Sequence, residues 1–255
     1  MTKAQQTLVL LHGGAMSGAS LRPIAKRLSH IRCLTPDLRG HGTKRSLAFS
    51  NLEQCADDIA CLIASETDRP VHLFGLSLGG YVSLNLLAQQ KVPIASAIIT
   101  GVAFADIRAK WLLRHVIGLV YPMLCLKSTR EMAGRLTGIN DAKLMSDPGS
   151  RGWARPSTVR DLARDILRCS PLDFAKRVSA PSVFLAGAYE PSAVRRGLEL
   201  VRAECASASA GIVEAGSHGW CINDPDFAAL VIERWLRGEP LPPGIDLTGS
   251  RFDQI

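Results

Sequence analysis

Six short segments of the chain are nearly continuous in apolar residues instead of alternating apolar with polar ones. This pattern is typical of strands that are buried on both faces of a parallel sheet. Stretches with helical periodicity separate most of the segments, so the sequence predicts an α/β fold with right-handed crossovers. The predicted strands are Thr7–Leu11, Ile31–Thr35, Val71–Gly75, Ser96–Thr100, Ser182–Ala186 and Gly211–Glu214.

The clearest helix spans Leu52–Ser65, where apolar residues recur with a period of about 3.6 residues. Ser50 and Glu53 have the spacing of a capping box at its start. The last helix begins at Asp224, which we expect to cap it, and ends at Gly238. We expect this helix to bury the apolar side chains Phe227, Leu230, Val231 and Trp235.

One interval breaks the alternation of strands and helices. About eighty residues separate the fourth predicted strand from the fifth, far more than a crossover requires. Helical segments are predicted there at Arg108–Leu119, Thr129–Leu136 and Pro156–Arg168. The fold expected is therefore a mostly parallel six-stranded sheet flanked by helices, with a helical cap inserted after the fourth strand. The core would comprise residues 1–104 and 171–255, and the cap residues 105–170, over the sheet edge where such folds bind ligands.

The third predicted strand runs into Gly75-Leu76-Ser77-Leu78-Gly79 and then into an apolar helix at Tyr81–Gln89. A serine hydroxyl is a useful nucleophile only when it is held in the open, beside a base. A sharp turn from strand to helix provides that exposure, and the two glycines let neighbouring backbone pass close to it. A glycine-rich turn with a helix-capping serine is the alternative interpretation of this segment.

Two further loops resemble those of the α/β-hydrolase superfamily. A glycine-rich turn with a helix-capping serine does not explain these loops. His12-Gly13-Gly14 follows the first strand, and Ser217-His218-Gly219 follows the sixth. The resemblance implies a Ser77 nucleophile, a His218 base, and an oxyanion hole formed by the backbone N–H groups of Gly14 and Leu78. It implies that His12 holds the loop structurally. Compact members, such as plant methyl esterases and hydroxynitrile lyases, similarly begin at this first strand.

The orienting carboxylate is the least regular part of the resemblance. Relatives commonly carry Gly-x-x-Asp after the fifth strand, and here Glu190 occupies the place of that aspartate. Its position just before Pro191 would also suit a surface acid beside a helix start. Asp106, soon after the fourth strand, is the alternative acid. The stretch Asp37–Gly42 is also familiar from this family, with Asp37 and Arg39 expected to bond backbone groups and His41 given no catalytic role.

Charge refines the expected substrate. The chain has a net charge of +7, and residues 106–170 contain twelve Lys or Arg against six acids. This basic insertion suggests an anionic substrate or an acidic carrier of an acyl group, with a solvated helical surface as the alternative. Nucleic acid is not expected as a partner, because acids interrupt the charge and no recognition motif is present.

The remaining composition sets further expectations. No apolar run approaches the ~18 residues of a membrane span, and a cytoplasmic location is the default. The seven cysteines form no CxxC pair, so we expect small buried thiols and no metal site. No cofactor is implied.

The expected activity is that of a serine hydrolase that cleaves a carboxylic ester, thioester or lactone through an acyl-enzyme. A lyase that uses the serine and histidine without an acyl intermediate, and a ligand-binding receptor of the same fold, are the alternatives. Apolar residues of the insertion and the loops are candidates for the acyl pocket: Met16, Trp111, Tyr121, Met123, Met145, Trp153 and Trp220.

Overall fold

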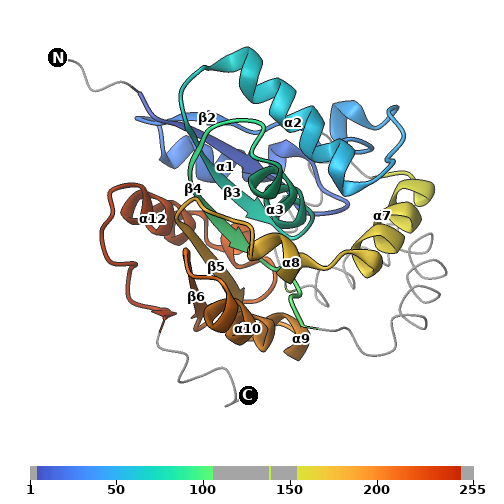
Figure 1. Cartoon of the computed structure of the whole chain (residues 1–255). Helices are drawn as coiled ribbons and strands as arrows, with labels where there is room; N and C mark the ends of the chain where they lie inside the picture. Colours follow the sequence, from blue (N-terminus) through green and yellow to red (C-terminus); the bar gives the residue numbers. More distant parts are fainter. Residues whose placement is uncertain (1–4, 106–137, 139–153, 248–255) are drawn as a thin grey trace.

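The computed structural model describes residues 5–105, 138 and 154–247 (Figure 1). A single sheet runs through the molecule in the order β2-β1-β3-β4-β5-β6-β7, and its first six strands run parallel to one another. The α/β class is therefore confirmed. These six strands overlap the six apolar segments of the sequence: β1 (Thr7–Leu11), β2 (Arg32–Leu34), β3 (Val71–Leu76), β4 (Ile94–Thr100), β5 (Ser182–Gly187) and β6 (Ala208–Val213).

The strand count differs from expectation by one. A short strand, β7 (Ile245–Asp246), pairs antiparallel with the end of β6, and Glu214 N–H donates to the carbonyl of Gly244 at 2.9 Å beside it. Two residues in a proline-rich tail are too few to show any periodicity. The expected six-stranded sheet is corrected to a seven-stranded one.

Helices cover both faces of the sheet, and each face has its own apolar core. Because side chains alternate along a strand, Val9 and Leu11 join one core while Leu8 and Leu10 join the other. One face is covered by α1 (Arg22–Arg27), α11 (Trp220–Asn223) and α12 (Pro225–Leu236). The other is covered by α2 (Leu52–Glu66), α3 (Leu78–Gln89), α8 (Pro171–Ala175) and α10 (Gly197–Glu204).

Two details of the helices differ from the sequence-based expectation. The cap of α2 is Asn51, whose side chain accepts from Gln54 N–H at 2.7 Å, and the expected capping box of Ser50 and Glu53 is one residue out of register. In α12, Leu230 is 41% exposed, because the buried face of that helix is formed largely by alanines and β-branched residues. The expected cap of α12 does form, since Asp224 accepts from Phe227 N–H at 2.9 Å.

Of the expected insertion, the structure describes residues 105, 138 and 154–170, which include α7 (Pro156–Arg168). The apolar residue Leu162 of α7 joins the core of the sheet, and the Asp165 carboxylate accepts from Leu52 N–H at 2.6 Å. The last helix predicted for the insertion thus packs at the start of α2 (Figure 1). The predicted segments Arg108–Leu119 and Thr129–Leu136 lie outside the described residues.

Candidate active site

Ser77 lies at the turn between β3 and α3, with φ 52° and ψ −112°. This left-handed backbone costs a non-glycine residue about 1–3 kcal/mol, so the surrounding structure must hold it. Gly79 allows the turn, because a Cβ there would lie 2.1 Å from the carbonyl oxygen of Leu11. The backbone of the turn is fixed on two sides: Ser77 N–H donates to the Thr100 carbonyl at 2.8 Å, and Gly79 N–H donates to the His12 carbonyl at 3.0 Å.

The two proposed oxyanion donors lie on this turn and on the β1 loop. Leu78 is the first residue of α3, and a donor in the first turn of a helix has no intrahelical acceptor. Gly14 lies under α7, where a Cβ would come within 3.3 Å of the Leu162 side chain. Within the described part of the chain, neither backbone N–H donates a hydrogen bond. Both are therefore available to an oxyanion.

His12 is fully buried and bonded within the loops. Its Nε2 accepts from Leu38 N–H at 3.0 Å, which requires the proton on Nδ1, and Nδ1 donates to the Gly13 carbonyl at 2.8 Å. Burial, and secondarily the neighbouring ring of His41, lower the pKa of His12 to about 3. A ring that stays neutral and uses both nitrogens has the structural role that the sequence suggested.

Asp37 and Arg39 both form bonds, but only Asp37 does so in the expected way. The Asp37 carboxylate accepts from Gly18 N–H at 2.8 Å and from the N–H and hydroxyl of Thr43 at 2.7 Å each. Arg39 instead forms a bidentate ion pair with the Asp58 side chain, at 2.9 and 3.0 Å. A planar guanidinium matches a carboxylate better than it matches a single carbonyl.

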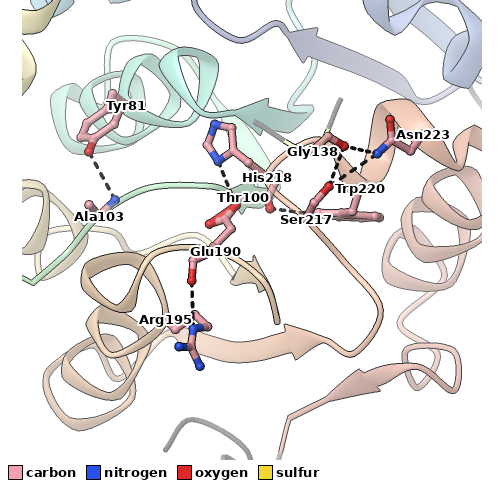
Figure 2. A network of polar contacts seen from close by, with 10 residues as sticks. All are labelled: Tyr81, Thr100, Ala103, Gly138, Glu190, Arg195, Ser217, His218, Trp220 and Asn223. Atoms are coloured by element: carbon pink, nitrogen blue, oxygen red, sulfur yellow. Dashed lines mark hydrogen bonds and ion pairs between the residues drawn. The ribbon is translucent and has the colours of Figure 1, made fainter. Parts of the chain in front are cut away.

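Glu190 and His218 meet from the loops that follow β5 and β6 (Figure 2). The Glu190 carboxylate is buried, and its Oε1 lies 2.9 Å from Nδ1 of His218. The His218 side chain is 29% exposed, so its ring remains accessible while its Nδ1 edge is held. Oε2 of Glu190 has no partner among the described residues. The pair can orient an imidazole and stabilise it when it takes up a proton.

Backbone contacts hold these two loops together. Tyr189 N–H donates to the Gly216 carbonyl at 3.0 Å, and Ala188 N–H donates to the Val213 carbonyl at 3.0 Å. Gly187 permits the close approach, because a Cβ at this position would lie 2.4 Å from the carbonyl oxygen of Gly216. The loop that carries Glu190 and the loop that carries His218 therefore form one packed unit.

Two contacts around this unit were not predicted from the sequence. Arg195, buried in α9 (Ser192–Arg195), donates from Nε to the Glu190 carbonyl at 3.0 Å. Ser217 donates from its hydroxyl to the carbonyl of Gly138 at 2.9 Å (Figure 2). This bond joins the loop that carries His218 to residue 138 of the insertion. No motif of the sequence marks either contact.

The hydroxyl of Ser77 and the ring of His218 do not form a hydrogen bond with each other in the part of the chain that the structure describes. Such contacts are often long in free enzymes and tighten when substrate binds. The end of β4 contacts both Ser77 and His218. The Thr100 carbonyl accepts from the backbone N–H of Ser77, and Gly101 lies against the His218 ring.

Few of the candidate pocket residues can be placed. Met16 is half-buried and packs against the core beneath α1. Trp220 belongs to the core, because it is 4% exposed, contacts the rings of Phe74 and Phe227, and donates from Nε1 to the Thr100 hydroxyl at 2.9 Å. Outside the described residues lie the alternative acid and the other pocket candidates: Asp106, Trp111, Tyr121, Met123, Met145 and Trp153.

Residues 5–105, 138 and 154–247 contain neither a metal-binding cluster nor a membrane-spanning helix. No group of three His, Cys, Asp or Glu side chains there has a geometry that would hold a metal ion. No helix in the same ranges is long and apolar enough to cross a membrane. The expectation of buried cysteines holds for Cys55, Cys205 and Cys221. It is corrected for Cys33 and Cys169, which are partly buried, and for Cys61, which is exposed on α2.

The chain is similar in sequence to curated proteins. The chain is 33% identical to the magnesium-chelatase 30 kDa subunit of Rhodobacter capsulatus over 120 residues. This match covers 46% of the chain and 39% of that subunit. The chain is 25% identical to the pimeloyl-[acyl-carrier protein] methyl ester esterase of Xanthomonas campestris, over 91% of the chain and 96% of that protein. In the shorter matches the chain spans about two fifths of the length of its curated relatives.

Solved structures show the same fold. A lipase-esterase related protein from Clostridium acetobutylicum superposes with a TM-score of 0.74 at 19% identity, covering 91% of this chain and 95% of that one. The sequence profile of the alpha/beta hydrolase family matches residues 8–237. The chain therefore belongs to the alpha/beta hydrolase family.

Proposed function

We propose that this protein is a serine ester hydrolase in which Ser77 is the nucleophile, His218 the base and Glu190 the carboxylate that orients it. The observation that carries the proposal is the contact of 2.9 Å between His218 Nδ1 and Glu190 Oε1, at the sheet edge where the strained turn presents Ser77. Relatives named as esterases and lipases support ester hydrolysis as the general activity.

The steps follow from these positions. The Ser77 oxygen attacks the ester carbonyl as its proton passes to Nε2 of His218, while Gly14 and Leu78 N–H groups bind the negative oxygen. The imidazolium then gives that proton to the departing alcohol, which leaves an acyl-serine. Water repeats the sequence, with His218 accepting its proton and returning it to Ser77, and the carboxylic acid is released.

A fluorophosphonate probe tests this proposal directly. The probe is expected to label Ser77, and the protein is expected to hydrolyse p-nitrophenyl esters. Ser77→Ala should abolish both, whereas Ser65→Ala, on the exposed side of α2, should change neither. A folded protein that hydrolyses no ester, thioester or lactone over a series of acyl lengths would overturn the proposal and favour the lyase or the receptor.

We further propose an acyl group on an anionic carrier as the substrate class. Arg155, Arg160 and Arg168 are exposed on or beside α7, whose opposite face packs on the β1 loop through Val159 and Leu162. A carrier docked on this face would thus lie near the oxyanion donors. The Xanthomonas campestris relative, named for an acyl-carrier protein ester, supports this substrate class.

Charge reversal tests the carrier. Reversing Arg160, Arg164 and Arg168 to Glu should lower kcat/KM for an acidic acyl-carrier substrate by about tenfold or more at low salt and leave a small p-nitrophenyl ester unaffected. Lys26→Glu, on the exposed side of α1, is the matched control. If kcat/KM for the carrier substrate is insensitive both to salt and to the three reversals, electrostatic steering by α7 is refuted.

A further inference from the structure

We infer that the carboxyl end of β4, the dipeptide Thr100–Gly101, positions the reacting side chains of this enzyme. The inference rests on the proposed function and adds two positioning residues to it. Neither residue carries a group that takes part in the proposed steps, and neither belongs to a motif of the sequence. Both are instead in contact with the elements that carry the nucleophile, the base and the acid.

Thr100 is fully buried and bonds in two directions. Its carbonyl accepts from Ser77 N–H at 2.8 Å, which fixes the strained turn of the nucleophile. Its hydroxyl oxygen accepts from the indole N–H of Trp220 at 2.9 Å, two residues beyond His218 (Figure 2). One residue thus connects the nucleophile turn to the segment that carries the base.

Gly101 acts by leaving space. A Cβ at this position would lie 2.7 Å from Cε1 and 3.1 Å from Nδ1 of His218, and 3.5 Å from Oε1 of Glu190. These are the atoms at the contact between base and carboxylate. The residue has φ +74°, and its N–H donates to the Leu185 carbonyl at 3.2 Å, so its Cα is fixed by the sheet. A methyl group here has to displace the ring of His218, because the backbone is tied to β5.

Gly238 supplies a matched control for this substitution. It has nearly the same backbone, φ +68°, but no atom lies within 4 Å of an added Cβ. Gly238→Ala therefore introduces the strain of a left-handed alanine without the crowding. The difference between Gly101→Ala and Gly238→Ala isolates the effect of the methyl group on the His218–Glu190 contact.

The experiment compares these two variants by ester hydrolysis, thermal melting and proton NMR of the imidazole N–H that faces Glu190. Gly101→Ala is expected to lower kcat by about 100-fold with KM changed less than threefold, since a displacement of about 1 Å costs this much. It should also remove the downfield, exchange-protected N–H resonance. Gly238→Ala should retain the resonance and kcat within threefold.

Thr100→Val keeps the inference testable if Gly101→Ala does not fold. Valine removes the acceptor of the Trp220 N–H at similar volume, and kcat should fall about fivefold, with Thr100→Ser restoring it to within twofold. The inference is overturned if Gly101→Ala retains the resonance and kcat within threefold of Gly238→Ala. If Gly101→Ala does not fold, it is overturned when Thr100→Val keeps kcat within twofold of the wild type. Because the resonance is read without substrate, a wild-type protein that hydrolyses no ester would refute the proposed function and leave this test valid.

Discussion

The loops after β1 and β2 and the loops after β5 and β6 hold the site by opposite means. On the first side, side chains bond backbone: the buried His12 accepts from Leu38 N–H, and the partly buried Asp37 accepts from Gly18 N–H and Thr43 N–H. On the second side, backbone bonds and glycines hold the loops while the Glu190 carboxylate reaches His218.

The difference follows from what each side contributes to the proposed chemistry. The first side must fix backbone N–H donors in place, so its side chains are used as supports. The second side must present side chains, so the supports are taken from the backbone. Substitutions on the two sides should therefore have different consequences, mainly on stability for the first and mainly on turnover for the second.

The largest effects are expected from the reacting side chains. Ser77→Ala and His218→Ala should each lower kcat/KM by about 10⁴- to 10⁶-fold, and the double variant should lose little more, because the two groups act as a unit. Steady-state hydrolysis of a p-nitrophenyl ester measures this. The comparison between the two sides fails if His12→Gln, with its fold intact, is as damaging as His218→Ala.

A smaller loss is expected at the carboxylate. Glu190→Gln should lower kcat by about 100- to 10,000-fold, because the ring loses its ionic support while the base and the oxyanion donors survive. The melting temperature should change little, since only one hydrogen bond to the carboxylate is altered. Asp106→Asn is the companion variant, and a larger loss of kcat there than in Glu190→Gln would identify Asp106 as the acid.

In the loop after β2, Asp37→Asn should lower the free energy of unfolding and have little effect on kcat. Burial opposes ionisation of this carboxyl, but hydrogen bonds from Thr43 and Gly18 outweigh it and lower its pKa below the ordinary value. Replacing the carboxylate should reduce the free energy of unfolding by about 2 kcal/mol, measured by urea denaturation at pH 7. A variant that unfolds like the wild type but has lost most of its kcat would contradict the division between the two sides.

A dependence of stability on pH is expected from His12. Because the pKa of folded His12 is about 3, the ring takes up a proton near pH 6.5 only when the chain unfolds. The unfolded state then binds more protons, so stability falls as the pH drops below about 6.5 and keeps falling toward pH 3. From this residue alone we expect a loss of about 2 kcal/mol between pH 7 and pH 5. Ring NMR signals of His12 that titrate above pH 5 in the folded protein would refute this explanation.

The fold was largely predictable because its strands are buried on both faces and therefore read as apolar runs. β1 was predicted to the residue, whereas β7 was missed, since two residues carry no period. Ser77, His218 and Glu190 could be nominated because each follows a strand, and parallel strands bring such positions to one edge.

What the sequence could not reveal depends on contacts between distant segments. The indole N–H of Trp220 donates to the hydroxyl of Thr100, which lies 120 positions away in the chain. The same applies to Gly101, whose importance comes from the position of the His218 ring and not from its neighbours in the chain.

The close approach of Gly187 to Gly216 has a consequence for engineering. The two loops contact each other through backbone atoms. Grafting only one of them from another hydrolase would therefore place a bulky residue, or an amide without a hydrogen-bond partner, where the loops meet. Transplanting both loops together, as one cassette, preserves the interlocking surface. In a chimaera built on this scaffold, the loop that carries Glu190 and the loop that carries His218 should therefore come from the same donor hydrolase.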